Sequence, residues 1–88
     1  MTVKQHMAKV AALGCILCRS LDIGETPAEL HHQKIDGIRA SDKDVIPLCV
    51  EHHRGMTGVH GLGRKAFERR YGLTEMDLLE MVKREVQP

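Results

Sequence analysis

The sequence predicts a small α+β domain with helices at both ends of the chain. Apolar residues recur at helical spacing near each terminus, two short extended runs lie between them, and cysteines and histidines gather around those runs. With 88 residues, one Phe, one Tyr and no Trp, the chain should form a single domain, residues 1–88, with an aliphatic core. A core this small stabilises the fold only modestly, and a structural metal is a common compensation.

The N-terminal part is expected to begin with a helix. Apolar residues at helical spacing cover residues 3–13, Thr2 is a suitable N-cap, and Gly14 suits the C-terminal cap. A tight turn at residues 15–18 and a polar loop at residues 19–28 should follow.

Two strands are expected in the middle of the chain. Residues 29–34 form the first extended run and residues 45–49 the second, with a polar loop at residues 36–43 between them. Pro47 lacks the N–H group that a central strand would donate, so the second strand should lie at an edge or a bulge.

Helices should fill the rest of the chain. One carries His52 and His53 and is interrupted at Gly55 and Gly58, and C-terminal helices follow over about residues 62–86. The first C-terminal helix should end at Gly72, and the second should begin after Thr74 as its N-cap. The expected apolar face of the last helix consists of Met76, Leu79, Val82 and Val86.

Cysteine count and charge restrict the class of protein. Three cysteines is an odd number and no secretory signal is visible, so we expect a reduced, cytoplasmic protein rather than a disulfide framework. No run approaches the roughly 20 apolar residues that a membrane span needs, so no membrane partner is expected. The net charge of +1 favours no particular partner.

Basic residues nevertheless gather directly after the histidines. Residues 54–70 contain five Lys or Arg residues, with Glu68 as the only acidic one. A run of this kind is often a solvated helix face, but beside a metal site it can bind phosphates. We expect DNA contacts from Arg54, Arg64 and Lys65.

A structural zinc site is indicated by two pairs of ligands with the same gap. Cys15 and Cys18 are separated by two residues, and Cys49 and His52 repeat that gap 31 residues after Cys18. Two such knuckles suit one tetrahedral Zn²⁺ with three thiolates and one imidazole. The alternatives are small buried cysteines or a redox pair, and pairing of CxxC with CxxH favours zinc over both.

The remaining histidines suggest a second metal site. Three imidazoles on one divalent ion leave positions open for water and phosphate, and a fourth unligated imidazole can take a proton from water. His31 and His32 can divide these two duties, because successive strand residues point to opposite faces. His53 and His60 would supply the other ligands, whereas His6 has no partner in the sequence.

These runs resemble the His-Asn-His (HNH) endonuclease superfamily. The matching runs are Glu29-Leu30-His31-His32, Cys49-Val50-Glu51-His52-His53 and the later His60. Members have a ββα-metal motif, in which two strands and a helix hold one divalent ion. The resemblance therefore implies a ββα-metal core with two zinc knuckles over about residues 15–62.

The resemblance also implies a role for each residue. His31 would bind the catalytic metal, His32 would be the general base, Asp44 would stand where the family's Asn steadies the base, and His53 and His60 would complete the metal site. An aspartate at position 44 departs from the family pattern, although it can orient an imidazole equally well. Asp44 could instead be an ordinary turn or cap residue.

The spacing of His53 and His60 is a second departure. Seven residues of unbroken helix rise about 10 Å, too far for two parallel side chains to share one ion. Gly55 and Gly58 can let the chain fold back and restore the geometry. Otherwise His60 contacts phosphate or stays idle.

The finer resemblance is to small phage recombination-enhancement nucleases that act with RecA filaments. It rests on the run Pro-Leu-Cys-x-x-His-His at residues 47–53, followed by Gly-Val-His-Gly-Leu-Gly at residues 58–63. It implies a phage or prophage protein in the bacterial host cytoplasm, with DNA as substrate and a RecA filament as partner.

The leading interpretation is a DNA endonuclease that hydrolyses phosphodiester bonds with Mg²⁺, Mn²⁺ or Zn²⁺ at the histidine site. The main alternative is a non-catalytic zinc module that binds DNA or a protein on the same scaffold. A cysteine redox protein is disfavoured, because the second knuckle ends in His52 and no βαβ pattern surrounds the first.

Overall fold

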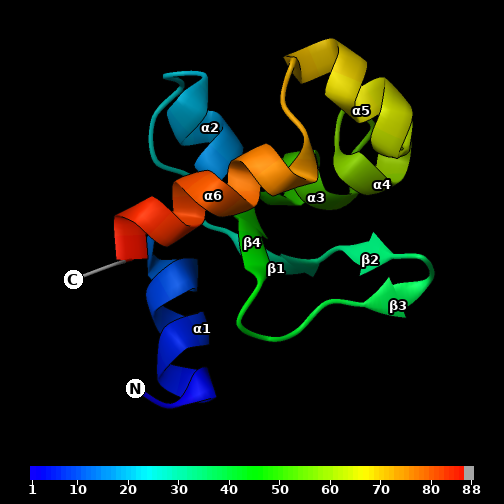
Figure 1. Cartoon of the computed structure of the whole chain (residues 1–88). Helices are drawn as coiled ribbons and strands as arrows, with labels where there is room; N and C mark the ends of the chain where they lie inside the picture. Colours follow the sequence, from blue (N-terminus) through cyan, green and yellow to red (C-terminus); the bar gives the residue numbers. More distant parts are fainter. Residues whose placement is uncertain (87–88) are drawn as a thin grey trace.

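The computed structural model describes residues 1–86 as six helices and four short strands (Figure 1). Their order is α1 (Val3–Ala12), α2 (Ile16–Ser20), β1 (Glu29–His32), β2 (Lys34–Ile35), β3 (Ile38–Arg39), β4 (Val45–Leu48), α3 (Val50–Arg54), α4 (Val59–Leu62), α5 (Arg64–Tyr71) and α6 (Glu75–Val86). Helices stand at both ends and the strands lie between them, which confirms the predicted α+β class. In this described part, no helix is long and apolar enough to cross a membrane.

The central feature is the antiparallel pair β1 and β4. His31 stands opposite Ile46 and His32 opposite Val45. All four residues of β4 are buried, because α1, α2 and α6 pack against this strand. Within residues 1–86 the sheet has only two strands, so β4 keeps one edge without a strand partner and Pro47 is tolerated there. The expected strands at residues 29–34 and 45–49 are thus present but end at His32 and Leu48.

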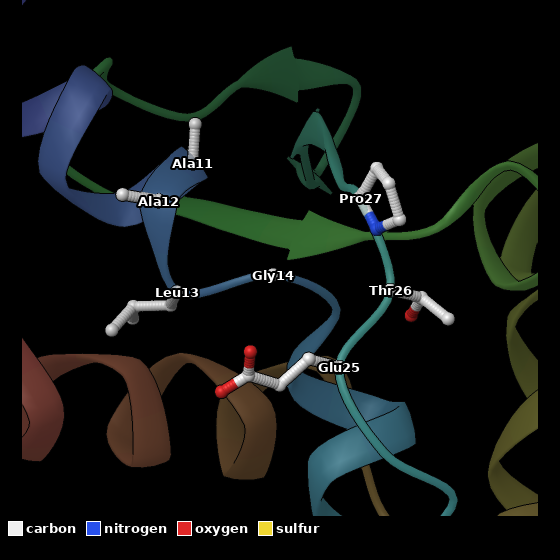
Figure 2. Close-up of a pocket in the computed structure, with 7 residues that line it drawn as sticks. All are labelled: Ala11, Ala12, Leu13, Gly14, Glu25, Thr26 and Pro27. Carbon is white, nitrogen blue, oxygen red and sulfur yellow. The ribbon is translucent and has the colours of Figure 1, made fainter.

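The N-terminal segment is held by local capping and by one close backbone approach. Thr2 and Gln5 form a capping box at the start of α1. Gly14 has a φ of +74°, and a Cβ there would lie 2.8 Å from the carbonyl oxygen of Thr26. That oxygen accepts a 3.0 Å hydrogen bond from the N–H of Cys15. Figure 2 shows the two segments side by side, lining a pocket of residues 11–14 and 25–27 that contains no histidine or cysteine.

Two expectations for the loops were wrong. The turn at residues 15–18 is the start of a helix, α2, with Cys15 as its N-cap. The polar loop at residues 36–43 begins inside a β-hairpin, because β2 and β3 pair across Asp36 and Gly37. Both turn residues have positive φ, +53° and +79°, as a type I′ hairpin turn requires.

The C-terminal helices end and begin at the predicted residues, but the first is broken in two and the last buries a different face from the expected one. The helix expected to end at Gly72 does so, yet it is broken into α4 and α5 at Gly63, where φ is +85°. Thr74 and Asp77 cap α6 reciprocally. The buried face of α6 is formed by Glu75, Leu78, Leu79 and Val82. Met76, expected on that face, is 54% exposed.

Candidate metal centres

Cys15, Cys18, Cys49 and His52 come together from two separate pieces of chain. Cys15 and Cys49 are the N-caps of the short helices α2 and α3, and the other two ligands lie three residues later. The four ligand atoms all lie within 4.8 Å of one another. Each knuckle is therefore the first turn of a helix, a geometry that points its two donors the same way.

The separations within this group fit one tetrahedral zinc ion. Nδ1 of His52 lies 3.6 Å from Sγ of Cys15, 3.5 Å from Sγ of Cys18 and 3.4 Å from Sγ of Cys49. The Sγ atoms of Cys18 and Cys49 are 3.8 Å apart. Zinc bonds of about 2.3 Å to sulfur and about 2.0–2.1 Å to nitrogen require tetrahedral edges of about 3.8 Å for S–S and about 3.5 Å for S–N.

Burial makes these donors dependent on a cation. Desolvation raises the pKa of the Cys15 thiol to about 12, so this sulfur keeps its proton at neutral pH unless a positive charge lies beside it. Desolvation also lowers the pKa of His52, which favours the neutral imidazole that can ligate. The three cysteines are free rather than disulfide-bonded. The donor set therefore has the chemistry of a zinc site.

His31, His53 and His60 form a second group, one residue each from β1, α3 and α4. One ligand atom of each lies within 4.8 Å of the others. The ring centroids are 5.3 Å apart for His31 and His53, 5.1 Å for His31 and His60, and 4.8 Å for His53 and His60. Burial lowers the pKa of His60, and the neighbouring His31 and His53 lower it further, so its neutral form is favoured.

A reversal of the chain between α3 and α4 closes the seven-residue gap from His53 to His60. The carboxylate of Glu51 accepts hydrogen bonds from the Thr57 N–H at 2.9 Å and the Thr57 hydroxyl at 2.6 Å. Gly61 packs so tightly that a Cβ there would overlap the carbonyl oxygen of Gly55. The glycines thus fold the chain back, as the sequence allowed, and His60 lies beside His53.

Two of the three histidines have a carboxylate at one ring nitrogen. Glu75, at the start of α6, lies 2.5 Å from Nε2 of the buried His31, and Glu29 of β1 lies 2.9 Å from Nδ1 of His53. The hydrogen bond from His53 is the main cause of the lowered pKa of Glu29. Metal-binding histidines characteristically donate their second N–H to such a group. Neither Nδ1 of His31 nor Nε2 of His53 takes part in these two contacts.

Neither carboxylate was expected at the site from the sequence. Glu75 is 44 residues away from His31, so only packing of α6 reveals the contact. One sequence signal was available: Glu75 occupies the same helical stripe as Leu78, Leu79 and Val82, where a carboxylate needs a partner.

His32 faces a different carboxylate from the expected one. Its Nε2 lies 2.8 Å from Oδ1 of Asp42. Asp44, expected to orient this ring, instead forms an ion pair with Lys83 of α6 at 3.2 Å. Residues 40–44 run as a short loop before β4, and the side chain two residues earlier is the one that reaches His32. The expected contact between Asp44 and His32 is therefore not present, and Asp42 makes it instead.

Arg39 of β3 also touches His32. Its Nη2 lies 3.1 Å from Nε2 and 3.3 Å from Nδ1 of the ring. Nearly equal distances to both nitrogens require a position over the ring face, since an in-plane position would collide with the carbon between them. The guanidinium thus leaves the in-plane lone pair of the imidazole available.

A cavity of about 350 Å³ opens beside His31 and His60 of the second group and beside His32. Its lining consists of His31, His32, Lys34, Val59, His60, Gly63, Arg64 and Glu75. Of the basic residues expected to contact DNA, Arg64 lies here, and Lys34 was not foreseen. Lys65 is exposed on α5. Arg54 makes two hydrogen bonds to Glu29, at 3.1 and 2.8 Å, in an ion pair on the protein surface.

The comparison with protein families matches nearly the whole chain. Residues 2–87 fit the family described as recombination enhancement, RecA-dependent nuclease. No curated protein matches the chain at a significant level. The family match confirms the predicted resemblance to recombination-enhancement nucleases, which implies a nucleic-acid substrate and a link to RecA. On this match over residues 2–87, the chain belongs to the RecA-dependent nucleases of recombination enhancement.

Proposed function

We propose that the protein is an HNH-type endonuclease that hydrolyses DNA phosphodiester bonds with one divalent ion and a histidine general base. The observation that carries the proposal is that two adjacent histidines of β1, His31 and His32, have different contacts. His31 belongs to a group of three imidazoles with ligand geometry. His32 borders the same cavity and is bound to Asp42 instead.

His31, His53 and His60 would hold the catalytic ion, while the three cysteines and His52 would hold a structural zinc. A divalent ion at the histidines would supply Lewis-acid stabilisation of the phosphate and its leaving oxygen. Three imidazoles suit zinc better than magnesium, which prefers oxygen donors. Glu75 and Glu29 would orient the rings of His31 and His53 through their second nitrogens.

His32 would act as the general base through Nδ1. The Asp42 carboxylate would accept a hydrogen bond from the Nε2–H group of His32. This tautomer has its proton on Nε2 and leaves Nδ1 as the proton acceptor. A water positioned in the cavity would give its proton to this nitrogen as it attacks the phosphorus. Asp42 steadies the ring and the charge that the ring then carries.

The substrate phosphate would enter the cavity between Arg64 and Lys34. Both side chains are exposed, and phosphate charge attracts them without regard to sequence. The chain contains only two aromatic residues, so stacking on unpaired bases contributes little. Selectivity would then come from DNA shape or from a RecA filament, consistent with the family description.

A plasmid-nicking assay with titrated Zn²⁺, Mn²⁺ and Mg²⁺ tests the proposal, with and without RecA filaments. His32→Ala should lower the nicking rate by roughly 10²- to 10⁴-fold, the usual contribution of a general base. Its zinc content and circular dichroism should stay unchanged, because His32 is not a ligand. His6→Ala is the control, since His6 belongs to neither metal group and its ring contacts the backbone carbonyl of Lys43.

Two results would contradict the proposal. Nicking by His32→Ala at the rate of His6→Ala would remove the assigned base. Absence of metal-dependent nicking by the native chain under every condition would leave the non-catalytic zinc module as the better description.

A further inference from the structure

The hairpin β2–β3 extends away from the helical part of the molecule as an arm next to β1 (Figure 1). Ile35 and Ile38 are cross-strand partners at its tip and are 54% and 71% exposed. Exposed isoleucines that face each other at the end of a hairpin contribute nothing to the core. As a contiguous apolar pair on the surface, they are a candidate contact with a partner.

Two cations stand directly behind the isoleucine pair. Lys34 and Arg39 are the next cross-strand pair of the hairpin, and both are exposed. Lys34 also lines the cavity beside the histidines, and Arg39 lies over the His32 ring. The arm is therefore continuous with the proposed active site. Asp36 is its only acidic residue and serves the turn, where its φ is positive.

We propose that this arm enters the minor groove of duplex DNA, with Ile35 and Ile38 wedged against a base step and Lys34 and Arg39 on the flanking phosphates. This inference rests on the proposed nuclease function and names the form of its substrate. Apolar wedges flanked by cations are the chemistry of proteins that bend DNA from the minor groove. Readout in the major groove would need polar side chains at the tip, and the tip has none but Asp36.

A bent duplex also suits the geometry of the site. The minor groove is about 6 Å wide, so a side-chain pair enters it more readily than a whole ribbon does. Wedging opens the base step and curves the backbone around the protein surface. With the wedge at the tip and the cavity at the base of the same hairpin, the curved strand would be drawn toward His32 and Arg64.

The test measures binding and bending apart from cleavage. A 20-bp duplex labelled at both ends reports affinity by fluorescence anisotropy and curvature by energy transfer, in a His60→Ala background that lacks one proposed metal ligand. The variant Ile35→Thr/Ile38→Thr keeps β-branched residues in the hairpin but removes the apolar ends. The matched control is Ile23→Thr, which is 63% exposed on the α2–β1 segment. Circular dichroism and zinc content verify the fold of each protein.

The double variant should lose the energy-transfer change and bind at least about tenfold more weakly, because each Ile→Thr change replaces an ethyl group by a hydroxyl and so loses at least one buried methylene equivalent. Lys34→Gln/Arg39→Gln should weaken binding and reduce the slope of log affinity against log salt by about 1 to 2.

Unchanged bending and affinity of the isoleucine variant relative to Ile23→Thr would overturn the proposal. A defect seen only with RecA filaments present would overturn it too, since the arm would then contact protein. Failure of the nuclease function alone would abolish cleavage while leaving binding and bending measurable.

Discussion

His31 and His32 are neighbours in the chain, yet different carboxylates hold their rings. His31 lies against Glu75 in the interior, and His32 lies against Asp42 at the cavity edge. Strand alternation separates the two side chains, and each carboxylate selects which ring nitrogen remains available. The proposed ligand and the proposed base thus differ in function because their surroundings differ, although their residue type is the same.

The two aspartates near β4 offer a matched pair for testing this. Asp42→Asn should lower the nicking rate about tenfold, which is less than the roughly 10⁴-fold loss for a buried aspartate that orients a catalytic histidine. The smaller effect is expected because the Asp42 side chain is 48% exposed. Asp44→Asn removes only the surface ion pair with Lys83, so its nicking rate should match the native protein. The reverse order of effects would favour Asp44 as the orienting residue.

Glu75 is expected to act on metal affinity rather than on the fold. Glu75→Gln keeps the size of the side chain but removes the negative charge of the carboxylate, whose Oε1 lies 2.5 Å from Nε2 of His31. We expect affinity for the catalytic ion to fall about 10- to 100-fold, measured by calorimetric titration with Co²⁺ or Mn²⁺. Glu80→Gln, on the exposed face of the same helix, is the control. Equal affinities of the two variants would leave Glu75 with a structural role only.

Among the helices and strands, features set by neighbouring residues could be predicted from the sequence, whereas contacts between distant segments could not. The Thr2 and Thr74 caps and the end of a helix at Gly72 depend on residues within one turn, and all three are present. The Asp36-Gly37 turn was also a local signal, but its strands are two residues long, so the segment resembled a loop. The contacts of Glu75 and Asp42 depend on how distant segments meet.

The reversal between α3 and α4 is the element on which the second metal site depends most. Gly61→Ala should push α4 away from the Gly55 carbonyl, with an overpacking cost of about 1–3 kcal/mol. His60 would move with it, so affinity for the catalytic ion should fall to the level of His60→Ala. The cysteine group should still hold its zinc ion, because both knuckles precede the reversal. Native affinity in Gly61→Ala would show that His60 is not needed as a ligand.

For the whole molecule, the two metal groups differ in what they connect. The cysteine group joins α2 to α3 across 31 residues of sequence and lies within the packed core, whereas the histidine group borders a cavity. Placement of Cys15, Cys18, Cys49 and His52 was predictable because repeated knuckle spacing is a local signal. The histidine group required the fold-back at Gly55 and Gly58, which the spacing alone left open.

Removal of the structural zinc should therefore unfold the chain, while removal of the catalytic ion should not. Structural zinc contributes about 10–16 kcal/mol in small peptides, which equals or exceeds the roughly 5–15 kcal/mol net stability of ordinary domains. A strong zinc chelator should abolish the cooperative thermal transition followed by circular dichroism, and Cys49→Ser should do the same. His60→Ala, which affects only the second group, should melt within a few degrees of the native protein. A chelated protein with zero zinc by elemental analysis and an unchanged melting temperature would show that hydrophobic packing of β4 against α1, α2 and α6 suffices without the metal.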